Sequence, residues 1–222
     1  MLVPALEGHR VWADSYTTSS NPLLTLETRL MRDMFCAVAP KRVFDVACGT
    51  GRWAAWFADR GASVLGIDIC AEMLARAPAR LHGRLVLGCA EALPIAANSA
   101  DLTLCSFAAG YFPGLELAIS EMARITRSGG YLVIGDLHPA AVAAGWTRSF
   151  RAGGCVYEME HFAYRVEDFT DAAQRAGFDF DSEVHGYFGE LEKPAFEKAG
   201  RLERFAQLTG VPAVWIGRWR KA

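Results

Sequence analysis

The amino-acid sequence predicts a three-layer α/β sandwich with a seven-stranded, mainly parallel sheet whose last strand is antiparallel. Short apolar or β-branched runs alternate with helical patterns between residues 42 and 136, which is the order expected for a parallel sheet covered by helices on both faces. A glycine-containing turn joins the first run to the first helical pattern. A further alternation of helix and strand follows towards the C-terminus.

Five strands and two crossover helices are predicted in the first part of this pattern. Aromatic residues recur at helical spacing between residues 53 and 57, and Gly61 stands where a helix C-terminal glycine is expected. Apolar residues repeat the same period over 115–125, before the Ser-Gly-Gly turn at 128–130. The expected strands are 42–47, 63–68, 84–88, 101–106 and 131–136.

The rest of the chain predicts covering segments and the end of the sheet. Glycines interrupt residues 139–164 as in a loop or irregular hairpin, and active-site covers often have this character. Near the N-terminus, the Asn21-Pro22 turn precedes a helical stretch through Phe35. Further expected elements are a helix over 166–176, a strand over 178–188, one helix over 194–208 and a closing strand over 211–219. We expect a single domain, 1–222, made of an N-terminal cover (1–39), a core (40–136), a second cover (137–165) and the C-terminal part of the sheet (166–222).

Composition excludes several classes of protein. The 222 residues are 52% hydrophobic and 22% charged, which is typical of a globular chain. The formal net charge of −2 provides no global positive field for binding nucleic acid. No apolar run approaches the roughly 18 to 20 residues of a membrane helix, and no secretory signal opens the sequence. We therefore expect a cytoplasmic protein without a nucleic-acid or membrane partner; its oligomeric state is left open.

The six cysteines show neither CxxC pairs nor a short Cys/His cluster, so reduced thiols and no metal site are predicted. Four of them stand at the ends of successive expected strands and should lie along one edge of the sheet. We interpret them as small residues suited to burial rather than as metal or redox ligands. They are Cys48, Cys70, Cys89 and Cys105.

The segment 43–51, Val-Phe-Asp-Val-Ala-Cys-Gly-Thr-Gly, carries the strongest chemical signal. Gly49 and Gly51 allow a ligand to approach the main chain, and the N-terminus of the next helix favours a carboxylate or phosphate. Asp68 ends the second expected strand, 17 residues after Gly51. A carboxylate at this place can accept both hydrogen bonds from a ribose diol, so the pattern predicts a nucleoside cofactor.

These motifs resemble those of the class I S-adenosylmethionine-dependent methyltransferases, in the small-molecule branch that includes ubiquinone and menaquinone biosynthesis enzymes. Residues 45–51 resemble the family's first motif, and 66–68 with 72–74 its second-strand signature. Residues 89–94 resemble the third-strand motif, 98–107 the fourth strand, and 124–130 the turn before the fifth. The resemblance covers residues 40–136 and implies a Rossmann-like fold, S-adenosylmethionine as cofactor and a small-molecule methyl acceptor.

The resemblance also implies a role for each matched residue. Asp45 is expected to orient the glycine turn and to lie next to the methionine amino group, with Gly49 and Gly51 beside the methionine moiety. Asp68 is expected to hold the ribose hydroxyls. The other implied contacts are Ile69 and Met73 around the adenine, Ala90 and Glu91 at its edge, the Ser106 carbonyl near the amino group or sulfonium, and Tyr16 at the methionine end.

Two positions depart from the family pattern. Ala47 stands where many relatives have glycine, and the turn should tolerate its single added methyl group. Cys89 replaces an acidic residue that commonly contacts the adenine amine. The loss of that charge-assisted hydrogen bond is worth about 1.5 to 3 kcal/mol unless Glu91 compensates.

His138, just after the fifth expected strand, is the predicted catalytic base, because ligands bind outside the carboxyl ends of parallel strands and histidine titrates near neutrality. A base is required when the acceptor arrives protonated. Asp136 is expected to cap the turn or orient His138. Packing in the core is the first expectation for five aromatic residues, and an aromatic wall for an apolar or cationic acceptor is the alternative: Tyr111, Phe112, Trp146, Phe150 and Tyr157. Oxygen, nitrogen, carbon and sulfur acceptors all fit the sequence.

Two alternative functions are compatible with parts of the pattern. A glycine turn followed by an acidic residue also serves nicotinamide oxidoreductases, although Ala54 stands where their third glycine is usual. A protein that binds S-adenosylmethionine without catalysis, or without transferring the methyl group, would keep the same fold. The fourth and fifth motifs favour the methyltransferase over the oxidoreductase.

Overall fold

The computed structural model describes residues 1–18, 20–36 and 39–222. Within these residues, seven strands form one sheet: β2 (Arg42–Val46), β3 (Ser63–Asp68), β4 (Leu85–Leu87), β5 (Ala100–Ser106), β6 (Thr126–Leu137), β9 (Phe178–Gly186) and β10 (Val214–Lys221). Their order is β4-β3-β2-β5-β6-β10-β9. The first five pair in parallel, and β10 is antiparallel to both of its neighbours. The predicted fold class, a mainly parallel sheet with an antiparallel last strand, is confirmed.

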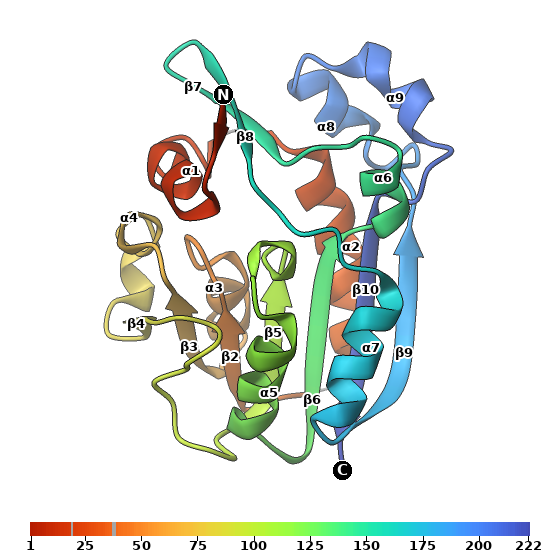
Figure 1. The fold of residues 1–222 in the computed structure, drawn as a ribbon. Coiled ribbons are helices and arrows are strands. Elements are labelled where there is room, and N and C mark those ends of the chain that lie inside the picture. The colour runs from red at the N-terminus through yellow and green to blue at the C-terminus, as the bar shows by residue number, and fades with distance from the viewer. Residues whose placement is uncertain (19, 37–38) are drawn as a thin grey trace.

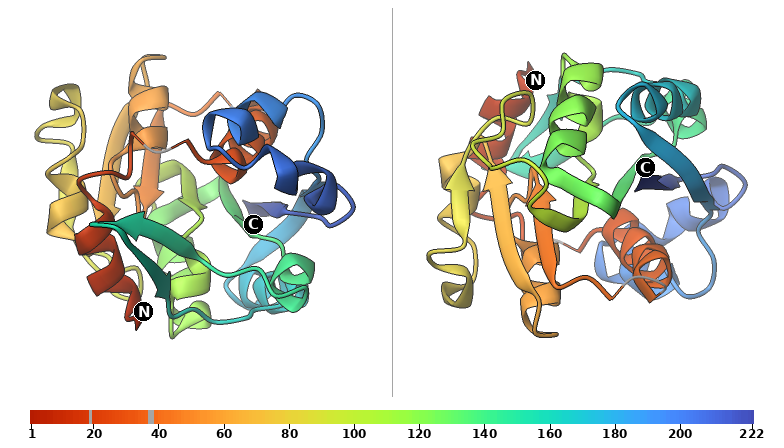
Figure 2. Two further views of the ribbon diagram at one scale, coloured as in Figure 1. Left: turned by 90° about the horizontal axis from the view of Figure 1, so that it is seen from above. Right: turned by 90° about the horizontal axis from the view of Figure 1, so that it is seen from below.

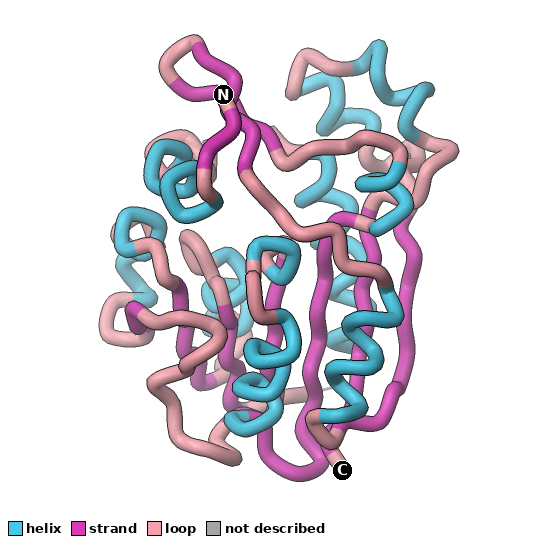
Figure 3. Tube along the Cα trace, in the orientation of Figure 1, coloured by secondary structure: helices cyan, strands magenta, loops and turns pink. Residues whose placement is uncertain are grey.

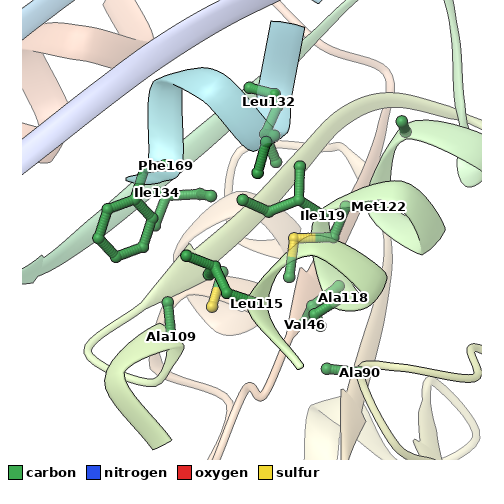
Figure 4. Close-up of a cluster of buried hydrophobic side chains, with 14 of the residues drawn as sticks. Val46, Ala90, Ala109, Leu115, Ala118, Ile119, Met122, Leu132, Ile134 and Phe169 are labelled. Atoms are coloured by element: carbon green, nitrogen blue, oxygen red, sulfur yellow. The ribbon is translucent and has the colours of Figure 1, made fainter. Parts of the chain in front are cut away.

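Helices cover both faces of this sheet (Figure 1). On one face lie α5 (Leu115–Ile125) and α7 (Val166–Arg175), and on the other α2 (Pro22–Cys36) and α3 (Arg52–Ala58). Leu132 and Ile134 of β6 belong to the core under α5 and α7, while Val133 between them belongs to the core under α2 and α3. Figure 4 shows the first of these cores. The two-residue period of a strand therefore supplies both cores.

The helix patterns predicted from spacing are present because their apolar faces are buried. In α5, Leu115, Ile119 and Met122 are at most 5% exposed, and in α3 Trp53 and Phe57 are at most 4% exposed. Full burial of a large apolar side chain contributes about 1.5 to 3 kcal/mol. Among the described helices, none combines the length and apolar character that crossing a membrane requires.

A second group of elements lies above the carboxyl ends of the parallel strands (Figures 1 and 2). Leu2–Val3 (β1) pairs with β8 (Cys155–Met159), which forms a hairpin with β7 (Ser149–Ala152), and this small sheet is separate from the main one (Figure 3). The group also contains α1 (Ala5–Trp12), α6 (Pro139–Ala143), α8 (Lys193–Lys198) and α9 (Leu202–Leu208). Shorter elements near the main sheet are α4 (Ala71–Leu74) and the 3₁₀ turns Ala79–Leu81 and Ala109–Tyr111.

The structure corrects three expectations. The single helix predicted over 194–208 is two helices, because Gly200 adopts a left-handed conformation (φ +64°) between α8 and α9. The segment 137–165 contains the predicted hairpin, with left-handed Gly153 and Gly154 at its turn, and also α6. At the N-terminus, β1 and α1 were not predicted, since the partner of β1 lies more than 150 residues away in sequence.

Packing around Gly217 in β10 yields a stability prediction. A Cβ added at this position would lie 2.4 Å from Trp219 and 2.8 Å from Trp215, which are both fully buried. We expect Gly217→Ala to lower the free energy of unfolding by about 1 to 3 kcal/mol through overpacking, measured by urea denaturation. Gly210→Ala is the control, because no atom lies within 4 Å of its added Cβ; equal stability of both variants would contradict the packing argument.

Candidate functional site

The turn between β2 and α3 is left-handed at three positions. Gly49 and Gly51 have φ angles of +55° and +76°, and Ala47, at the position where the family pattern has glycine, has +55°. An L-residue in this region costs roughly 1 to 2 kcal/mol, so Ala47 is a strained position that the surrounding turn tolerates. At Gly51 an added Cβ would lie 2.6 Å from Leu81 Cδ1. Gly51 is therefore required by its left-handed conformation and by its packing against Leu81, and the predicted passage of this main chain beside a cofactor stays a prediction.

Asp68 connects this turn to the end of β3. Its carboxylate accepts hydrogen bonds from the backbone N–H of Gly49 (2.7 Å) and of Cys70 (2.8 Å), one on each oxygen. A carboxylate offers about four acceptor positions, so two remain for a ligand. The side chain is buried, and burial raises its pKa. Next to it Ile69 is 53% exposed, an apolar surface beside a polar anchor.

Asp45 lies at the end of β2, directly beneath the glycine turn. Its carboxylate accepts a hydrogen bond from the Ala54 N–H (3.0 Å) in the first turn of α3. The residue is 2% exposed, and desolvation raises its pKa to about 7 despite that hydrogen bond and the nearby Arg52. The predicted role of Asp45 in orienting the glycine turn agrees with this contact. A cation next to this carboxylate would stabilise its ionised form.

A buried network that the motifs did not reveal lies beside the turn. Glu27 of α2 is fully buried and receives hydrogen bonds from Arg52 (2.7 Å), Trp53 Nε1 (3.2 Å) and the Ser106 hydroxyl (2.5 Å). Arg52 also donates to Ser106 (3.1 Å) and to Thr28 (2.6 Å). The network fixes the Arg52 guanidinium, whose side chain is 32% exposed, at the start of α3. No local pattern around Glu27 indicated this, because its partners lie on other elements.

Tyr16 approaches the same place from the N-terminal cover. The charges of Arg52, Glu27, Asp68 and Asp45 all act on its hydroxyl, and burial raises its pKa. The phenol therefore stays protonated at neutral pH. Its ring meets Trp12 edge-on, with centroids 4.7 Å apart.

The residues predicted for the adenine lie around the ends of β3 and β4. Met73 is 2% exposed in α4, and a Cβ added at Gly49 would lie 3.2 Å from its terminal methyl carbon. Ala90 is buried, and the Cys89 thiol donates a hydrogen bond to Glu91 Oε2. The second carboxylate oxygen of Glu91 is buried and has no hydrogen-bond partner among the described residues. A buried acceptor without a donor is costly, so this oxygen is a place for a ligand donor.

A cavity of about 560 Å³ lies next to Tyr16, beneath the N-terminal cover and the β7–β8 hairpin. Its size suits a small organic molecule. Trp12 and Phe150 stack within its wall, with centroids 4.8 Å apart and planes 9° from parallel, and Trp146 stacks on Phe188 on another side. Of the predicted aromatic wall, Tyr111, Trp146 and Phe150 line the cavity, whereas Phe112 and Tyr157 do not.

His9 is a cavity residue that sequence reasoning missed. Its Nδ1 lies 2.8 Å from the Ala5 carbonyl, which can only accept, so Nδ1 carries the proton and Nε2 holds a lone pair. Nε2 has no hydrogen-bond partner among the described residues. The ring meets Tyr111 edge-on at 5.0 Å, and burial lowers its pKa. His9 is thus neutral at pH 7, with a basic nitrogen available.

Arg148 and Asp136 form a buried ion pair at the cavity wall, with N···O 2.6 Å and side chains 8% and 3% exposed. Asp136 also accepts hydrogen bonds from the N–H groups of Gly110 and Leu137, each at 2.7 Å. The hydrogen bond from the Leu137 N–H agrees with the expectation that Asp136 caps the turn. The side chain that Asp136 orients is Arg148 rather than His138.

His138 lies away from the cavity lining. Its Nδ1 accepts a hydrogen bond from the Ala140 N–H (3.0 Å), which caps α6, and its Nε2 lies 2.8 Å from Nδ1 of His185 in β9. Burial and the neighbouring His185 lower its pKa. Both ring nitrogens are therefore engaged by protein groups, unlike those of His9.

The cysteines at the strand ends are free thiols, namely Cys48, Cys70, Cys89 and Cys105. Desolvation raises the pKa of each of them, which keeps the thiols protonated. In the described part of the chain, no group of three or more His, Cys, Asp or Glu side chains is arranged to hold a metal ion.

Comparison with known proteins gives consistent matches. The model of the methyltransferase domain family matches residues 44–134. A demethylmenaquinone methyltransferase of Renibacterium salmoninarum is 38% identical over 113 residues, which are 50% of this chain and 48% of that protein. That of Thermus thermophilus is 36% identical over 198 residues, which are 83% and 86% of the two chains. The chain spans about half the length, or less, of several curated relatives that it matches.

Solved structures agree on the fold. An S-adenosylmethionine-dependent methyltransferase from Mesorhizobium loti superimposes with a TM-score of 0.67 at 24% identity, over 88% of this chain and 98% of that one. The extended match to the Thermus protein, at 36% identity over 86% of its length, decides the family. The chain belongs to the class I S-adenosylmethionine-dependent methyltransferases, in the branch similar to the quinone-biosynthesis enzymes.

Proposed function

We propose that this protein transfers the methyl group of S-adenosylmethionine to a small molecule held in the cavity beneath α1 and the β7–β8 hairpin. The supporting observation is the position of Tyr16. Its hydroxyl lies in the field of Asp45, Asp68 and Arg52 on the cofactor side, and the same residue lines the 560 Å³ cavity. The glycine turn and the cavity therefore meet at the Tyr16 side chain, as transfer of a methyl group between two bound molecules requires.

The residues around the turn suit this cofactor. Asp68 has acceptor positions left for ribose hydroxyls, and exposed Ile69 offers an apolar face for a base. The orphaned oxygen of Glu91 can accept from the adenine amine in place of the acidic residue that Cys89 replaces. Asp45 matches an ammonium and Arg52 a carboxylate, the two charges of a methionine moiety.

When bound, S-adenosylmethionine supplies an electrophilic methyl group on a sulfonium that leaves as a neutral thioether. The chain consequently needs to position the acceptor, exclude water and remove a proton where the acceptor carries one. The hairpin and α1 cover the cavity, and stacked Trp12 and Phe150 orient a flat or apolar skeleton. We infer that residues 1–39 and 137–165 serve as covers of one domain.

His9 is the general base that the geometry favours. The Ala5 carbonyl fixes its tautomer, its Nε2 is available, and its lowered pKa keeps it unprotonated at pH 7. The catalytic role predicted for His138 stays a prediction, and the contacts of His138 with Ala140 and His185 support a structural function. The cytoplasmic location and the absence of nucleic-acid and membrane partners also stay predictions.

Thermal shift with each cofactor tests the function first. Stabilisation by S-adenosylhomocysteine and none by NADH is expected; the reverse would establish the oxidoreductase. Transfer of labelled methyl from S-adenosylmethionine to a fraction of a metabolite extract then separates an enzyme from a protein that merely binds the cofactor. Binding without transfer to any fraction would favour the latter.

Replacement of Asp68 should weaken the cofactor site. We expect Asp68→Ala to reduce S-adenosylhomocysteine affinity by about 1 to 3 kcal/mol, since it loses ribose contacts and releases the Gly49 N–H. Isothermal titration calorimetry measures this. Asp59→Ala, on the exposed end of α3, is the control and should leave affinity within twofold. Unchanged affinity in Asp68→Ala would refute the assignment of this carboxylate.

Asp45 should make the stability of the free protein depend on pH. Because its folded pKa of about 7 lies above its unfolded value, the fold disfavours the ionised form, and stability is lost as pH rises from 5 to 7. The stability of Asp45→Asn minus that of the wild type should therefore grow by on the order of 2 kcal/mol between pH 5 and pH 8. Urea unfolding at both values measures it. A difference that does not change with pH would contradict the buried carboxylate.

The rate of methyl transfer to the first acceptor identified distinguishes the roles of His9 and His138. We expect His9→Ala to lower kcat by about 10²- to 10⁴-fold and to abolish the acidic limb of the pH–rate profile, with S-adenosylhomocysteine affinity unchanged. His138→Ala should destabilise the fold by about 0.5 to 2 kcal/mol through loss of the α6 cap. Exposed His82→Ala is the control. A slow His138→Ala enzyme with normal stability would restore His138 as the base.

A further inference from the structure

The charge of the acceptor cavity is unlike that of the rest of the chain. The formal net charge of the protein is −2, yet five basic side chains and no Asp or Glu are among the described residues that line the cavity. The five are Arg148, Arg151, Lys198, Arg201 and Arg204. Lining by a single sign of charge focuses the potential inside a cleft with low-dielectric walls.

Four of these cations come from different elements that meet at the cavity. Arg151 lies on β7, Lys198 ends α8, Arg201 precedes α9 and Arg204 lies within it. These elements lie at the top of the molecule in Figure 1. Glu197 and Glu203 lie on the same two helices but do not line the cavity. Lys193 of α8 does not line the cavity either and pairs with Glu190 (3.2 Å), so the cations at the cavity are those at the end of α8 and at the start of α9 and within it.

The four cations lack ion-pair partners within the described residues, although many arginines elsewhere on this protein have them. Arg29, Arg80 and Arg175, for example, each lie within 3.0 Å of a carboxylate oxygen. Lysine and arginine side chains that converge without counterions repel one another, and an anion between them removes that repulsion.

Arg148 extends the positive charge into the buried part of the cavity. Its guanidinium pairs with Asp136 on one side and lies 4.8 Å from the centre of the Tyr111 ring. Its Nε is buried and has no acceptor in the described structure. The stacked pairs Trp12–Phe150 and Trp146–Phe188 line the same cavity. The cavity is therefore aromatic in its walls and cationic at its mouth.

We propose that the methyl acceptor is an anion, an apolar or aromatic skeleton that carries a carboxylate or phosphate group. The skeleton lies against the stacked aromatic pairs with its reactive atom towards His9 and Tyr16, and the anionic group lies among Lys198, Arg201 and Arg204. This inference rests on the proposed function and specifies its substrate class. Carboxylate and phosphate share the recognition chemistry of these side chains.

A matched pair of fluorescent probes tests the charge preference. 8-Anilinonaphthalene-1-sulfonate is an aromatic anion, and N-phenyl-1-naphthylamine is the same skeleton without the charge. Both are titrated into protein saturated with S-adenosylhomocysteine, so that the cofactor site is filled. We expect the anion to bind with 1:1 stoichiometry and at least tenfold more tightly than the neutral probe at low salt.

Neutralising variants locate the effect. The triple variant Lys198→Gln, Arg201→Gln, Arg204→Gln should lose at least tenfold in affinity for the anion and less than twofold for the neutral probe. The control removes three exposed charges away from the cavity, Lys41→Gln, Arg84→Gln and Arg220→Gln, and should leave both probes within twofold. If the cavity triple fails to fold, Arg201→Gln by itself should still lose at least threefold for the anion.

The remaining outcomes are decisive. Displacement of the anionic probe by benzoate or by inorganic diphosphate tells the carboxylate source from the phosphate source. Equal loss in both triple variants, or no loss in either, would overturn the proposal. A further contrary result would combine two observations: the protein binds phosphatidylglycerol vesicles through the three cations, and it binds the anionic and neutral probes equally well. That result would overturn the proposal in favour of a lipid surface. If calorimetry detects no binding of S-adenosylhomocysteine to the wild-type protein, that result would instead contradict the proposed function itself.

Discussion

The hydrogen bond from the Gly49 N–H to the Asp68 carboxylate is the contact on which the site depends. It joins the turn after β2 to the end of β3, two strands that pair in parallel with Asp45 opposite Gly66 and Val46 opposite Ile67. Parallel pairing places both carboxyl ends at one edge of the sheet, and this hydrogen bond, together with the one from the Cys48 N–H to the Ile67 carbonyl (3.0 Å), fixes their relative height there. The left-handed turn and the Asp68 carboxylate consequently form one unit, and a shift in either strand would displace both.

Charge around this unit is arranged to be completed by a ligand. Buried Asp45 is held near its titration point, Glu91 has an orphaned oxygen, and Arg52 is already paired with Glu27. A zwitterionic ligand that also bears an amine would compensate the Asp45 carboxylate and the orphaned Glu91 oxygen, and it would leave the pair between Arg52 and Glu27 intact. The free protein therefore carries a modest electrostatic cost around this turn, and on the proposed function the cofactor removes it, which is a common way for a site to be pre-organised at the expense of stability.

Sequence reasoning anticipated the glycine turn and its place at the strand ends because the determinants of that turn are local. Residues 45–51 and Asp68 are short motifs on regular elements, and strand ends read from apolar runs gave β3 its observed bounds, Ser63–Asp68. The acceptor side was less predictable. His9 and Glu27 acquire their surroundings from contacts between distant segments, and β1 pairs with a strand more than 150 residues away. His138 was singled out for its place after a strand, a position that did not reveal its partner His185 in β9.

The same distinction explains why one fold can serve many acceptors. The sheet order fixes the cofactor turn through hydrogen bonds between neighbouring strands, whereas the cavity wall is assembled from α1, the β7–β8 hairpin, α8 and α9, which contact the sheet through side chains. Substitutions in those covers change the shape and charge of the cavity without altering the register of β2 on β3. In this chain the covers contribute stacked aromatic rings and cations that have no ion-pair partner among the described residues, so on the proposed function acceptor selection resides in segments whose composition can vary while the turn after β2 keeps its geometry.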